Sequence, residues 1–398
     1  MKGRRNAWPG SKYQNVGTIL FGDFNTQPSE KIAGFDMDST LILTKSGKTF
    51  AQSADDWKWW DDSVVPKLKK AHEEGFKVVI FSNQAGVSVG KTTSAALEKK
   101  FINMQKSLKI PMQTLCATDS DGNRKPAVGM WDFFSKNCNG GVAIDKAQSF
   151  YCGDAAGRVK TKSTPKDFSD SDRKFAINCG IEFLTPEMYF LGKKEKLPDL
   201  GFTMKQFESR EGDCPVVGEE LKTMAADEKE MVLFVGAPGA GKSTLWKNHF
   251  SDYVRVNNDT LKTKEKCMKV AREALQSGKS CVIDNTNPGM KILISSLTIN
   301  IDTDTRSRYT KIAKEFKVPI RCFFFDLEKP ICMHNNKQRK INEHRTHLSK
   351  KVGDVIIHTF FKRVQKPTTD EGFSEVKTIK FVPGPFENDK DKEAYYAL

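Results

Sequence analysis

The segment G-A-P-G-A-G-K-S at residues 236–243 limits the possible folds of this chain more than any other part of its sequence. It matches the pattern G-x-x-x-x-G-K-[ST] at every fixed position, between the apolar run M-V-L-F-V and a helix-forming run from Thr244 to Phe250. In that context the glycines allow backbone N–H groups to surround phosphate oxygens at the start of a helix. A glycine-rich turn that holds a lysine by accident would lack this strand and this helix. The sequence therefore predicts a phosphate-binding loop in an α/β domain with a parallel sheet.

This loop predicts a nucleoside triphosphate as a ligand. Lys242 should reach the β- and γ-phosphates, and the Ser243 hydroxyl should bind Mg²⁺. The basic run H-N-N-K-Q-R-K at 334–340 would close over the phosphates, with Arg339 stabilising charge in the transition state. A solvated helix face is the alternative interpretation of that run. The predicted nucleotide-binding residues are Gly236, Gly239, Gly241, Lys242, Ser243, Thr244 and Arg339.

Two aspartates follow strand-like segments beyond the loop. Asp259, in V-R-V-N-N-D-T-L, is placed to remove the proton from an acceptor hydroxyl, as kinases of small substrates require. The same position would also suit a helix cap, and the two roles are compatible. Asp284 ends the strand-like run C-V-I-D and is a candidate for the outer coordination of Mg²⁺. The second half of the chain therefore reads as a kinase of the phosphate-loop type.

The first half carries a different signal, I-A-G-F-D-M-D-S-T at residues 32–40. Asp36 and Asp38 follow an apolar strand, where unpaired carboxylates are costly to desolvate unless they have a chemical task. Residues two apart on a strand point to the same side, so the two carboxylates can act together. We predict that Asp36 attacks phosphorus and forms an aspartyl-phosphate. Asp38 would protonate the leaving oxygen and then activate water.

Three later segments supply the other parts of a phosphatase site. Ser82 and Asn83 end the strand K-V-V-I-F and offer hydroxyl and amide donors to phosphoryl oxygens, and Lys125 offers a fixed cation. Asp154 follows the strand S-F-Y-C and would complete a magnesium site, since clustered carboxylates and a phosphate repel one another without a cation. The predicted metal ligands are Asp36, Asp38 and Asp154 in the first half and Ser243 in the second.

The charge of the chain favours a polyanionic partner such as nucleic acid. Lysine and arginine total 64 against 50 acidic residues, which gives a net charge of +14. Arg158, Lys160 and Lys162 follow Asp154 closely, and we predict that they contact the nucleic-acid backbone. The aromatic run W-K-W-W at 57–60 could stack on bases, but packing of the following helix is the favoured interpretation for Trp57.

Other features exclude two classes of protein. The sequence has no apolar run long enough to span a bilayer, and its first residues lack the apolar core of a secretory signal. Its nine cysteines are scattered without zinc-binding spacing, which indicates free thiols in a reducing compartment.

Taken in order, the motifs resemble a known family. D-M-D-S-T, S-N-Q, R-K-P-A-V-G-M-W-D and G-D-A-A-G-R are similar to the haloacid-dehalogenase-type phosphatase half of the polynucleotide kinase 3′-phosphatases. G-A-P-G-A-G-K-S-T, V-N-N-D-T-L and V-I-D-N-T-N-P resemble the kinase half of the same family. The resemblance runs from Lys31 to Val382, which is most of the chain.

The resemblance implies an α/β fold class, with a haloacid-dehalogenase-like Rossmannoid parallel sheet followed by a P-loop kinase domain. It also implies a Mg²⁺-dependent 3′-phosphatase and an ATP-dependent 5′-hydroxyl kinase that repair DNA ends. Asp36, Asp38 and Asp259 would be the catalytic residues, and Ser82, Asn83 and Lys125 would bind the phosphoryl group. We further expect a nuclear monomer that meets other strand-break repair proteins and no membrane.

We expect an N-terminal extension at 1–30, a phosphatase domain at 31–192, a linker at 193–230, a kinase domain at 231–385 and a charged tail at 386–398. The extension is too short for the forkhead-associated module of the larger animal members. Three residues depart from the family's usual pattern. Ser39 replaces glycine, and Asn258 and Lys337 each replace arginine.

Two other functions remain open at this point. A small-metabolite phosphatase fused to a metabolite kinase would need no nucleic acid, and it would leave the excess of basic residues unexplained. A binding module that has lost catalysis is disfavoured, because every predicted catalytic position carries a competent side chain.

Overall fold

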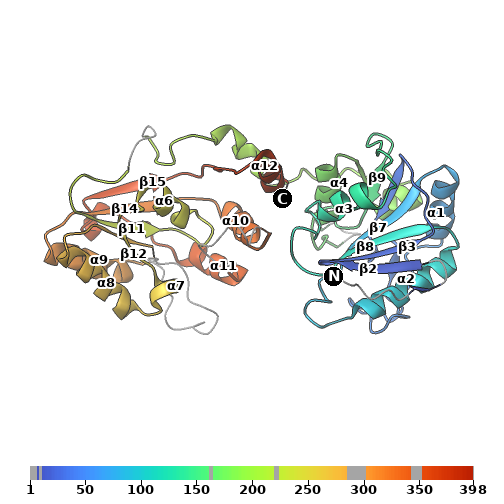
Figure 1. The fold of residues 1–398 in the computed structure, drawn as a ribbon, viewed down its shortest axis with the longest axis horizontal. Coiled ribbons are helices and arrows are strands. Elements are labelled where there is room, and N and C mark those ends of the chain that lie inside the picture. The colour runs from blue at the N-terminus through green and yellow to red at the C-terminus, as the bar shows by residue number, and fades with distance from the viewer. Residues whose placement is uncertain are drawn as a thin grey trace. The chain divides into compact units, whose positions relative to one another are not determined.

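The computed structural model describes residues 7–8, 11–160, 165–218, 224–284, 302–341 and 352–397 (Figure 1). The chain divides into two compact units, which we call the first unit (Met1–Gly201 with Ala397–Leu398) and the second unit (Phe202–Tyr396). Within the described ranges, no helix combines the length and the apolar character that crossing a membrane requires.

The first unit is built on an eight-stranded sheet in the order β1-β2-β3-β8-β7-β4-β9-β10. Its strands are β1 (Ala7–Trp8), β2 (Ser11–Val16), β3 (Ile19–Phe24), β4 (Ile32–Phe35), β7 (Lys77–Asn83), β8 (Met112–Ala117), β9 (Phe150–Cys152) and β10 (Glu182–Leu184). The strands from β8 to β10 are parallel, and β1, β2, β3 and β8 pair antiparallel. All residues of β4 and β8 are buried, which explains their continuous apolar sequences.

Helices cover both faces of this sheet. The core on one face includes residues of α1 (Val64–Glu73), α2 (Ser94–Leu108) and α5 (Pro186–Leu191), and the core on the other includes residues of α3 (Gly129–Asn137) and α4 (Ser171–Cys179). Helix α2 begins after Thr93, whose side chain accepts a hydrogen bond from the Ala96 N–H and caps the helix. A separate pair of short strands, β5 (Ile42–Leu43) and β6 (Lys58–Trp59), follows the D-x-D motif.

The tryptophans of the W-K-W-W run belong to the packing of the first unit. Trp57, Trp59 and Trp60 are partly buried against the core that contains α1 and α2. The Trp57 and Trp59 rings meet edge to face with centroids 5.3 Å apart. The packing interpretation therefore accounts for these side chains.

The second unit has a five-stranded sheet in the order β12-β13-β11-β14-β15, and every neighbouring pair is parallel. Its strands are β11 (Met231–Val235), β12 (Val254–Val256), β13 (Cys281–Ile283), β14 (Ile320–Phe325) and β15 (Glu375–Ile379). The fully buried β11 lies in the centre, with β13 on one side and β14 on the other. Ligands of such sheets bind at the carboxyl end of the central strands, where the phosphate-binding loop follows β11.

The helices of the second unit also form two layers. One layer contributes residues of α6 (Lys242–His249), α10 (Lys329–Ile341), α11 (Asp354–Arg363) and α12 (Asp389–Tyr396) to its core, and the other contributes α8 (Lys264–Gln276) and α9 (Thr303–Glu315). The short helices are α7 (Asn258–Leu261) and the 3₁₀ turns η1 (Met204–Arg210) and η2 (Thr369–Glu371). Both units therefore have the α/β architecture with parallel strands that the sequence predicts.

The edges of both units differ from the sequence analysis. Residues 11–24, expected in an extension, form β2 and β3 and extend the sheet of the first unit. Met204 and Phe207 lie in the segment expected as a linker with some packed portions, and they are buried in the core of the second unit. Tyr396, expected in a mobile tail, is also buried there as part of α12. Strand pairing holds the first of these segments in its sheet, and a few buried side chains hold the other two in the core of the second unit.

Candidate active sites

The phosphatase residues meet at the carboxyl ends of three neighbouring parallel strands. Asp36 directly follows β4, and its N–H donates to the Cys152 carbonyl over 2.9 Å, which continues the pairing of β4 with β9. Asp154 follows β9, while Ser82 and Asn83 end β7 on the other side of β4. Parallel pairing therefore brings together residues that lie far apart in the sequence.

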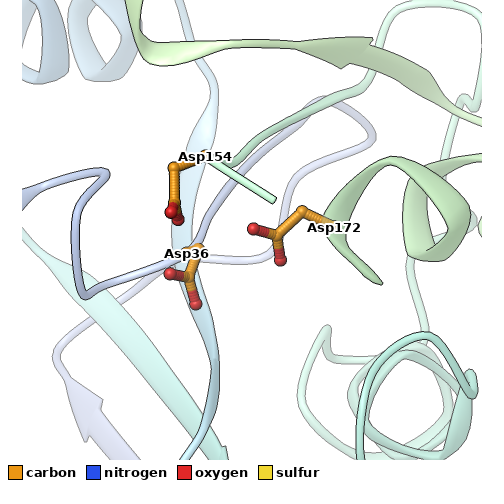
Figure 2. A group of neighbouring side chains, drawn as sticks. All are labelled: Asp36, Asp154 and Asp172. Carbon is orange, nitrogen blue, oxygen red and sulfur yellow. The ribbon is translucent and has the colours of Figure 1, made fainter. Parts of the chain in front are cut away.

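Three carboxylates form the centre of this site (Figure 2). Asp36, Asp154 and Asp172 each offer one oxygen, and these oxygens lie within 4.8 Å of one another. Asp172 lies in the first turn of α4, so the cluster joins two strand ends to a helix start. Its carboxylate accepts the Ala155 N–H over 3.0 Å, next to Asp154.

Lys125 is buried against the carboxylate cluster. Its Nζ lies 2.6 Å from Asp36 Oδ1 and 2.8 Å from Asp172 Oδ1. The ammonium also donates to the Tyr151 hydroxyl over 2.6 Å, and this hydroxyl in turn donates to the Phe81 carbonyl. The lysine is thus held at three points, as the sequence predicts for a fixed cation.

Asn83 holds the backbone of Lys125. Its Oδ1 accepts the Lys125 N–H over 2.9 Å, and its Nδ2 donates to the Lys125 carbonyl over 3.0 Å. Because both ends of the amide are engaged, Asn83 positions the lysine in this structure and does not present its side chain to a phosphate. Ser82 is buried and remains the predicted phosphate ligand at this strand end.

The electrostatics of the cluster fit a divalent cation. Burial raises the pKa of Asp36 well above its ordinary value, and Lys125 only partly opposes this. Burial, reinforced by the charge of Asp172, also raises the pKa of Asp154 to about 7. One lysine therefore does not compensate three carboxylates, and an all-oxygen donor set of this kind suits Mg²⁺.

The sequence analysis missed Asp172. It lies in an acidic run that also contains Asp167 and Asp170, and spacing alone does not distinguish these three carboxylates. A signal was nevertheless present in Gly153. A Cβ at that position would lie 2.5 Å from the Asp172 carboxylate, so the glycine is needed for the approach of α4.

Asp38 has a different environment from Asp36. Its side chain is exposed, and Asp38 Oδ2 accepts a hydrogen bond from Gln84 Nε2 over 2.8 Å. The same Nε2 lies 3.0 Å from Ser82 Oγ, so Gln84 links the predicted acid/base to the predicted phosphate ligand. Sequence reasoning assigned no role to Gln84. Ser39 has φ of 63°, a conformation that glycine adopts without strain, which explains the family's preference for glycine at this position.

Arg158 is engaged inside the first unit. Its guanidinium lies 3.0 Å from Asp167 and 2.8 Å from Glu187, and it donates to the Asp154 carbonyl over 3.2 Å. Its charge is therefore balanced by carboxylates, and the prediction that it contacts nucleic acid has no support in this geometry. Lys160 is exposed, so its contact with nucleic acid stays a prediction, and Lys162 lies outside the described residues.

In the second unit, neighbouring segments shape the phosphate-binding loop. Gly239 has φ of 86°, and a Cβ there would lie 2.4 Å from the Cys332 carbonyl oxygen of α10. A Cβ on Gly236 would lie 2.7 Å from the Phe325 side chain at the end of β14. Close packing thus requires glycine at both positions. Gly241 begins α6 with φ of 90°.

Lys242 is folded onto the loop. Its Nζ donates to the Gly236 carbonyl over 2.7 Å and to the Ala237 carbonyl over 2.8 Å, and the side chain is buried. The ammonium therefore already lies inside the curve of the loop where phosphates are expected.

Ser243 and Asp284 lie together beside the loop. Ser243 Oγ lies 3.3 Å from Asp284 Oδ2, and the Arg255 guanidinium contacts both groups. Arg255 also lies 4.5 Å from the centre of the Trp246 ring. Among the described residues, the fully buried Asp284 Oδ1 has no hydrogen-bond partner. An unsatisfied buried carboxylate oxygen next to a serine hydroxyl fits the predicted magnesium position. Sequence reasoning did not anticipate Arg255.

The remaining predicted kinase residues are only partly described. Asp259 lies in α7, but its side chain is outside the described residues. Arg339 lies on α10 and Thr244 on α6, so both belong to helices next to the loop. Their contacts with a nucleotide remain predictions.

Comparison with known proteins decides the family. Residues 31–190 match the family described as polynucleotide kinase 3 phosphatase, and residues 262–362 match one described as AAA domain. The chain is 38% identical over 356 residues to the bifunctional polynucleotide phosphatase/kinase of Schizosaccharomyces pombe, covering 89% of this chain and 80% of that protein. This chain belongs to the bifunctional polynucleotide phosphatase/kinase family. The family, the fold class and the presence of an enzyme are therefore confirmed as the sequence predicted.

Two further relatives place the bifunctional polynucleotide phosphatase/kinase family in context. A putative bifunctional polynucleotide phosphatase/kinase of Acanthamoeba polyphaga mimivirus is 32% identical over 397 residues, covering 92% of this chain and 89% of that protein. A polynucleotide 3′-phosphatase of Saccharomyces cerevisiae is 31% identical over 214 residues, covering 40% of this chain and 87% of its own length. The two relatives named as bifunctional thus match most of this chain, whereas the relative named for the phosphatase alone matches 40% of it.

Proposed function

We propose that the first unit removes 3′-phosphates from DNA ends and that the second unit phosphorylates 5′-hydroxyl ends with ATP. The observation that carries this proposal is the buried ammonium of Lys125 between Asp36 and Asp172, in a chain that also holds a complete phosphate-binding loop. A ligase needs a 3′-hydroxyl and a 5′-phosphate, so the two activities together prepare a broken strand for joining.

The first half-reaction in the phosphatase unit begins at Asp36. Lys125 holds its Oδ1, which leaves Oδ2 for attack on the phosphorus. As the new oxygen–phosphorus bond forms, the bond to the 3′-oxygen breaks, and the Asp38 carboxylic acid gives that oxygen its proton. The products are an aspartyl-phosphate and a 3′-hydroxyl end. Ser82, buried at the end of β7, would donate to a phosphoryl oxygen.

In the second half-reaction Asp38 takes a proton from water, and the water oxygen attacks phosphorus and releases Asp36 with inorganic phosphate. The exposure of Asp38 and its hydrogen bond to Gln84 suit a group that exchanges protons with water. Asp36, Asp154 and Asp172 would hold Mg²⁺, which would offset the charge of the carboxylates and the phosphate when bound.

In the kinase unit the backbone N–H groups of the loop and Lys242 would bind the β- and γ-phosphates of ATP. Asp259 would accept the proton of the 5′-hydroxyl as its oxygen attacks the γ-phosphorus and ADP leaves. Ser243 and Asp284 would hold Mg²⁺, and Arg339 on α10 would stabilise the charge of the transferring group.

The proposed substrate is DNA because the net charge of +14 favours a polyanion and the named relatives act on polynucleotides. We further propose a nuclear location and contact with other strand-break repair proteins, since that is where broken DNA strands are joined. Imaging of the tagged protein before and after DNA damage tests the location, and exclusion from the nucleus under both conditions would contradict it.

The reaction is tested on a nicked duplex with a 3′-phosphate and a 5′-hydroxyl, incubated with Mg²⁺ and labelled ATP. We expect release of inorganic phosphate and transfer of label to the 5′ end. Small phosphate esters and free nucleosides serve as competing substrates. A preference for those small molecules over the nick would contradict a DNA end-processing role.

A further inference from the structure

The helix α12 near the end of the chain is joined to the phosphate-binding loop by two consecutive hydrogen bonds. The Tyr395 hydroxyl of α12 donates to Asn335 Oδ1 of α10 over 2.5 Å. Asn335 Nδ2 in turn donates to the Gly239 carbonyl over 2.8 Å. Tyr395 is thus one side chain away from the backbone of the loop, although it comes from a segment with no recognisable motif.

The Gly239 carbonyl belongs to a peptide group whose orientation shapes the loop. On the other side of that peptide, the Ala240 N–H donates to the Ala237 carbonyl over 3.1 Å. Ala237 is also one of the two carbonyls that accept Lys242 Nζ. Asn335 therefore binds the carbonyl of the peptide between Gly239 and Ala240. The N–H of the same peptide binds the Ala237 carbonyl, which also accepts Lys242 Nζ.

Tyr395 stabilises the orientation of the Asn335 amide. A carboxamide has an acceptor oxygen on one side and a donor nitrogen on the other. The Gly239 carbonyl can only accept, so it requires the nitrogen, and the Tyr395 hydroxyl supplies a donor to the oxygen on the opposite side. Burial raises the pKa of Tyr395, so its hydroxyl keeps its proton and remains a donor.

The Tyr395 ring is itself fixed by packing. It meets the His334 ring of α10 edge to face at 4.8 Å and the Phe386 ring at 5.2 Å. The neighbouring Tyr396 makes a different contact, because its hydroxyl donates to Glu211 over 2.7 Å. Lys392 binds Glu211 as well, at 3.1 Å. The two tyrosines therefore fasten the same helix to different parts of the second unit.

We propose that Tyr395 is a positioning residue of the nucleotide site: through Asn335 it fixes the peptide of Gly239 in the conformation that receives the phosphates of ATP. This inference rests on the kinase activity proposed above and adds α12 to the site. Of the two tyrosines of α12, Tyr395 would thus support the nucleotide site, whereas Tyr396 only fastens the helix to Glu211.

The test compares Tyr395→Phe with Tyr396→Phe in the full chain. Each change removes one hydroxyl from α12, but only the first disconnects Asn335. Binding of ADP with Mg²⁺ is measured by calorimetry, and hydrogen exchange of the peptide that contains residues 236–243 is measured without nucleotide. Thermal unfolding of each sample, followed by circular dichroism, checks that the second unit is folded, because the phosphatase rate would report only on the first unit.

For Tyr395→Phe we expect ADP to bind roughly threefold to tenfold more weakly, as the loss of one hydrogen bond implies. The loop amides should exchange faster, and KM for ATP should rise while KM for the 5′-hydroxyl end stays the same. Tyr396→Phe should leave the exchange of the loop and the affinity for ADP at wild-type values.

Equal affinity and equal loop exchange in Tyr395→Phe and the wild-type protein would overturn the inference. Equal changes in both variants would also overturn it, because they would show that the effect comes from general loosening of α12 and not from the hydrogen bond to Asn335. If the wild-type protein bound no ADP, the proposed kinase activity itself would fail, and the exchange measurement would still decide the link from Tyr395 to the loop.

Discussion

The first and second units both place their phosphate-handling groups beyond the carboxyl ends of parallel strands, but they gather those groups from different lengths of chain. The first unit draws Asp36, Lys125, Asp154 and Asp172 from four separate segments. The second unit takes most of its site from the eight-residue loop at 236–243. Side chains therefore do in one unit what backbone amides do in the other.

The two central lysines show the same contrast. Lys125 is paired with two buried carboxylates, whereas Lys242 donates to two backbone carbonyls. A lysine that balances buried charge supports both the fold and the reaction of its unit. A lysine held by neutral carbonyls can serve its ligand with little consequence for the fold when it is removed.

The largest expected effect is the loss of one activity while the other is retained. Asp36→Asn should lower the rate of 3′-phosphate release by at least about four orders of magnitude, because a covalent nucleophile is lost. Labelling of 5′ ends by ATP should continue, and Lys242→Ala should give the reverse pattern on the same nicked substrate. Loss of both activities in a folded single variant would mean that the sites are not independent.

The next effect concerns the carboxylate that the sequence analysis missed. Asp172→Asn should lower the phosphatase rate about a hundredfold and weaken Mg²⁺ binding, since the variant keeps the shape but removes one charge from the cluster. Asp170→Asn is the matched control, because Asp170 pairs with Lys174 and lies outside the cluster. Equal losses in the two variants would show that Asp172 acts only through the start of α4.

The lysine contrast predicts a difference in stability. Lys125→Met should lower the free energy of unfolding of the first unit by about 3 kcal/mol, because two buried carboxylates lose their cation. Urea unfolding can be followed by tryptophan fluorescence, since only Trp246 of the six tryptophans belongs to the second unit. Lys242→Met should leave this transition in place. A similar decrease in the free energy of unfolding in both variants would show that the two lysines do not differ in their contribution to the fold.

Arg158 and Lys160 are expected to have different roles: Arg158 positions Asp154, and Lys160 contacts DNA. Arg158→Gln should lower kcat of the phosphatase about tenfold, because the guanidinium supports the Asp154 carbonyl, and should leave the salt dependence of DNA binding unchanged. Lys160→Gln should instead raise KM and reduce the salt slope by about one. A reduced salt slope in the arginine variant would restore its predicted role in DNA binding.

The smallest effect is a pH dependence confined to the first unit. Asp154 has a folded pKa of about 7 against an ordinary value of 3.8, so it holds a proton below neutrality in the metal-free protein. Mg²⁺ must displace this proton, and its affinity should fall from about pH 8 to about pH 6. The metal-free unit should lose stability as the pH rises between the two pKa values.

Calorimetry in buffers of different ionisation enthalpy measures the protons released, and Asp154→Asn should reduce that release, with the remainder coming from Asp36, whose pKa is also raised by burial. ADP binding by the second unit should show no comparable release near neutral pH. Equal proton release in the variant and the wild-type protein would assign the titration to another group.

The sequence predicted the central elements well because buried parallel strands and amphipathic helices leave strong patterns. The helix-forming run predicted from Thr244 lies in α6 (Lys242–His249), and the apolar run before Gly236 is β11. The edges were harder to predict. Strand β2 is mostly polar and β3 contains a glycine and an aspartate, while α12 buries little besides its tyrosines, so the sequence of these segments gives only a weak signal.

The candidate sites were also easier to predict where their residues form a continuous pattern in the sequence. The phosphate-binding loop is continuous in sequence, so its pattern revealed it directly. Asp172 and Arg255 act through pairings that only folding creates, since their partners lie in other segments. The ion pairs of Arg158 could not be predicted for the same reason, because Asp167 and Glu187 meet it only after folding.

The absence of a side chain at Gly153 limits which substitutions this enzyme can accept. Because a single added carbon would collide with the Asp172 carboxylate, the residue with no functional group at all sets the spacing of the charged ones. An added methyl group would push Asp172, and the start of α4 with it, away from Asp36 and Asp154. A residue that takes no part in the chemistry should therefore be restricted in sequence together with the carboxylates that do.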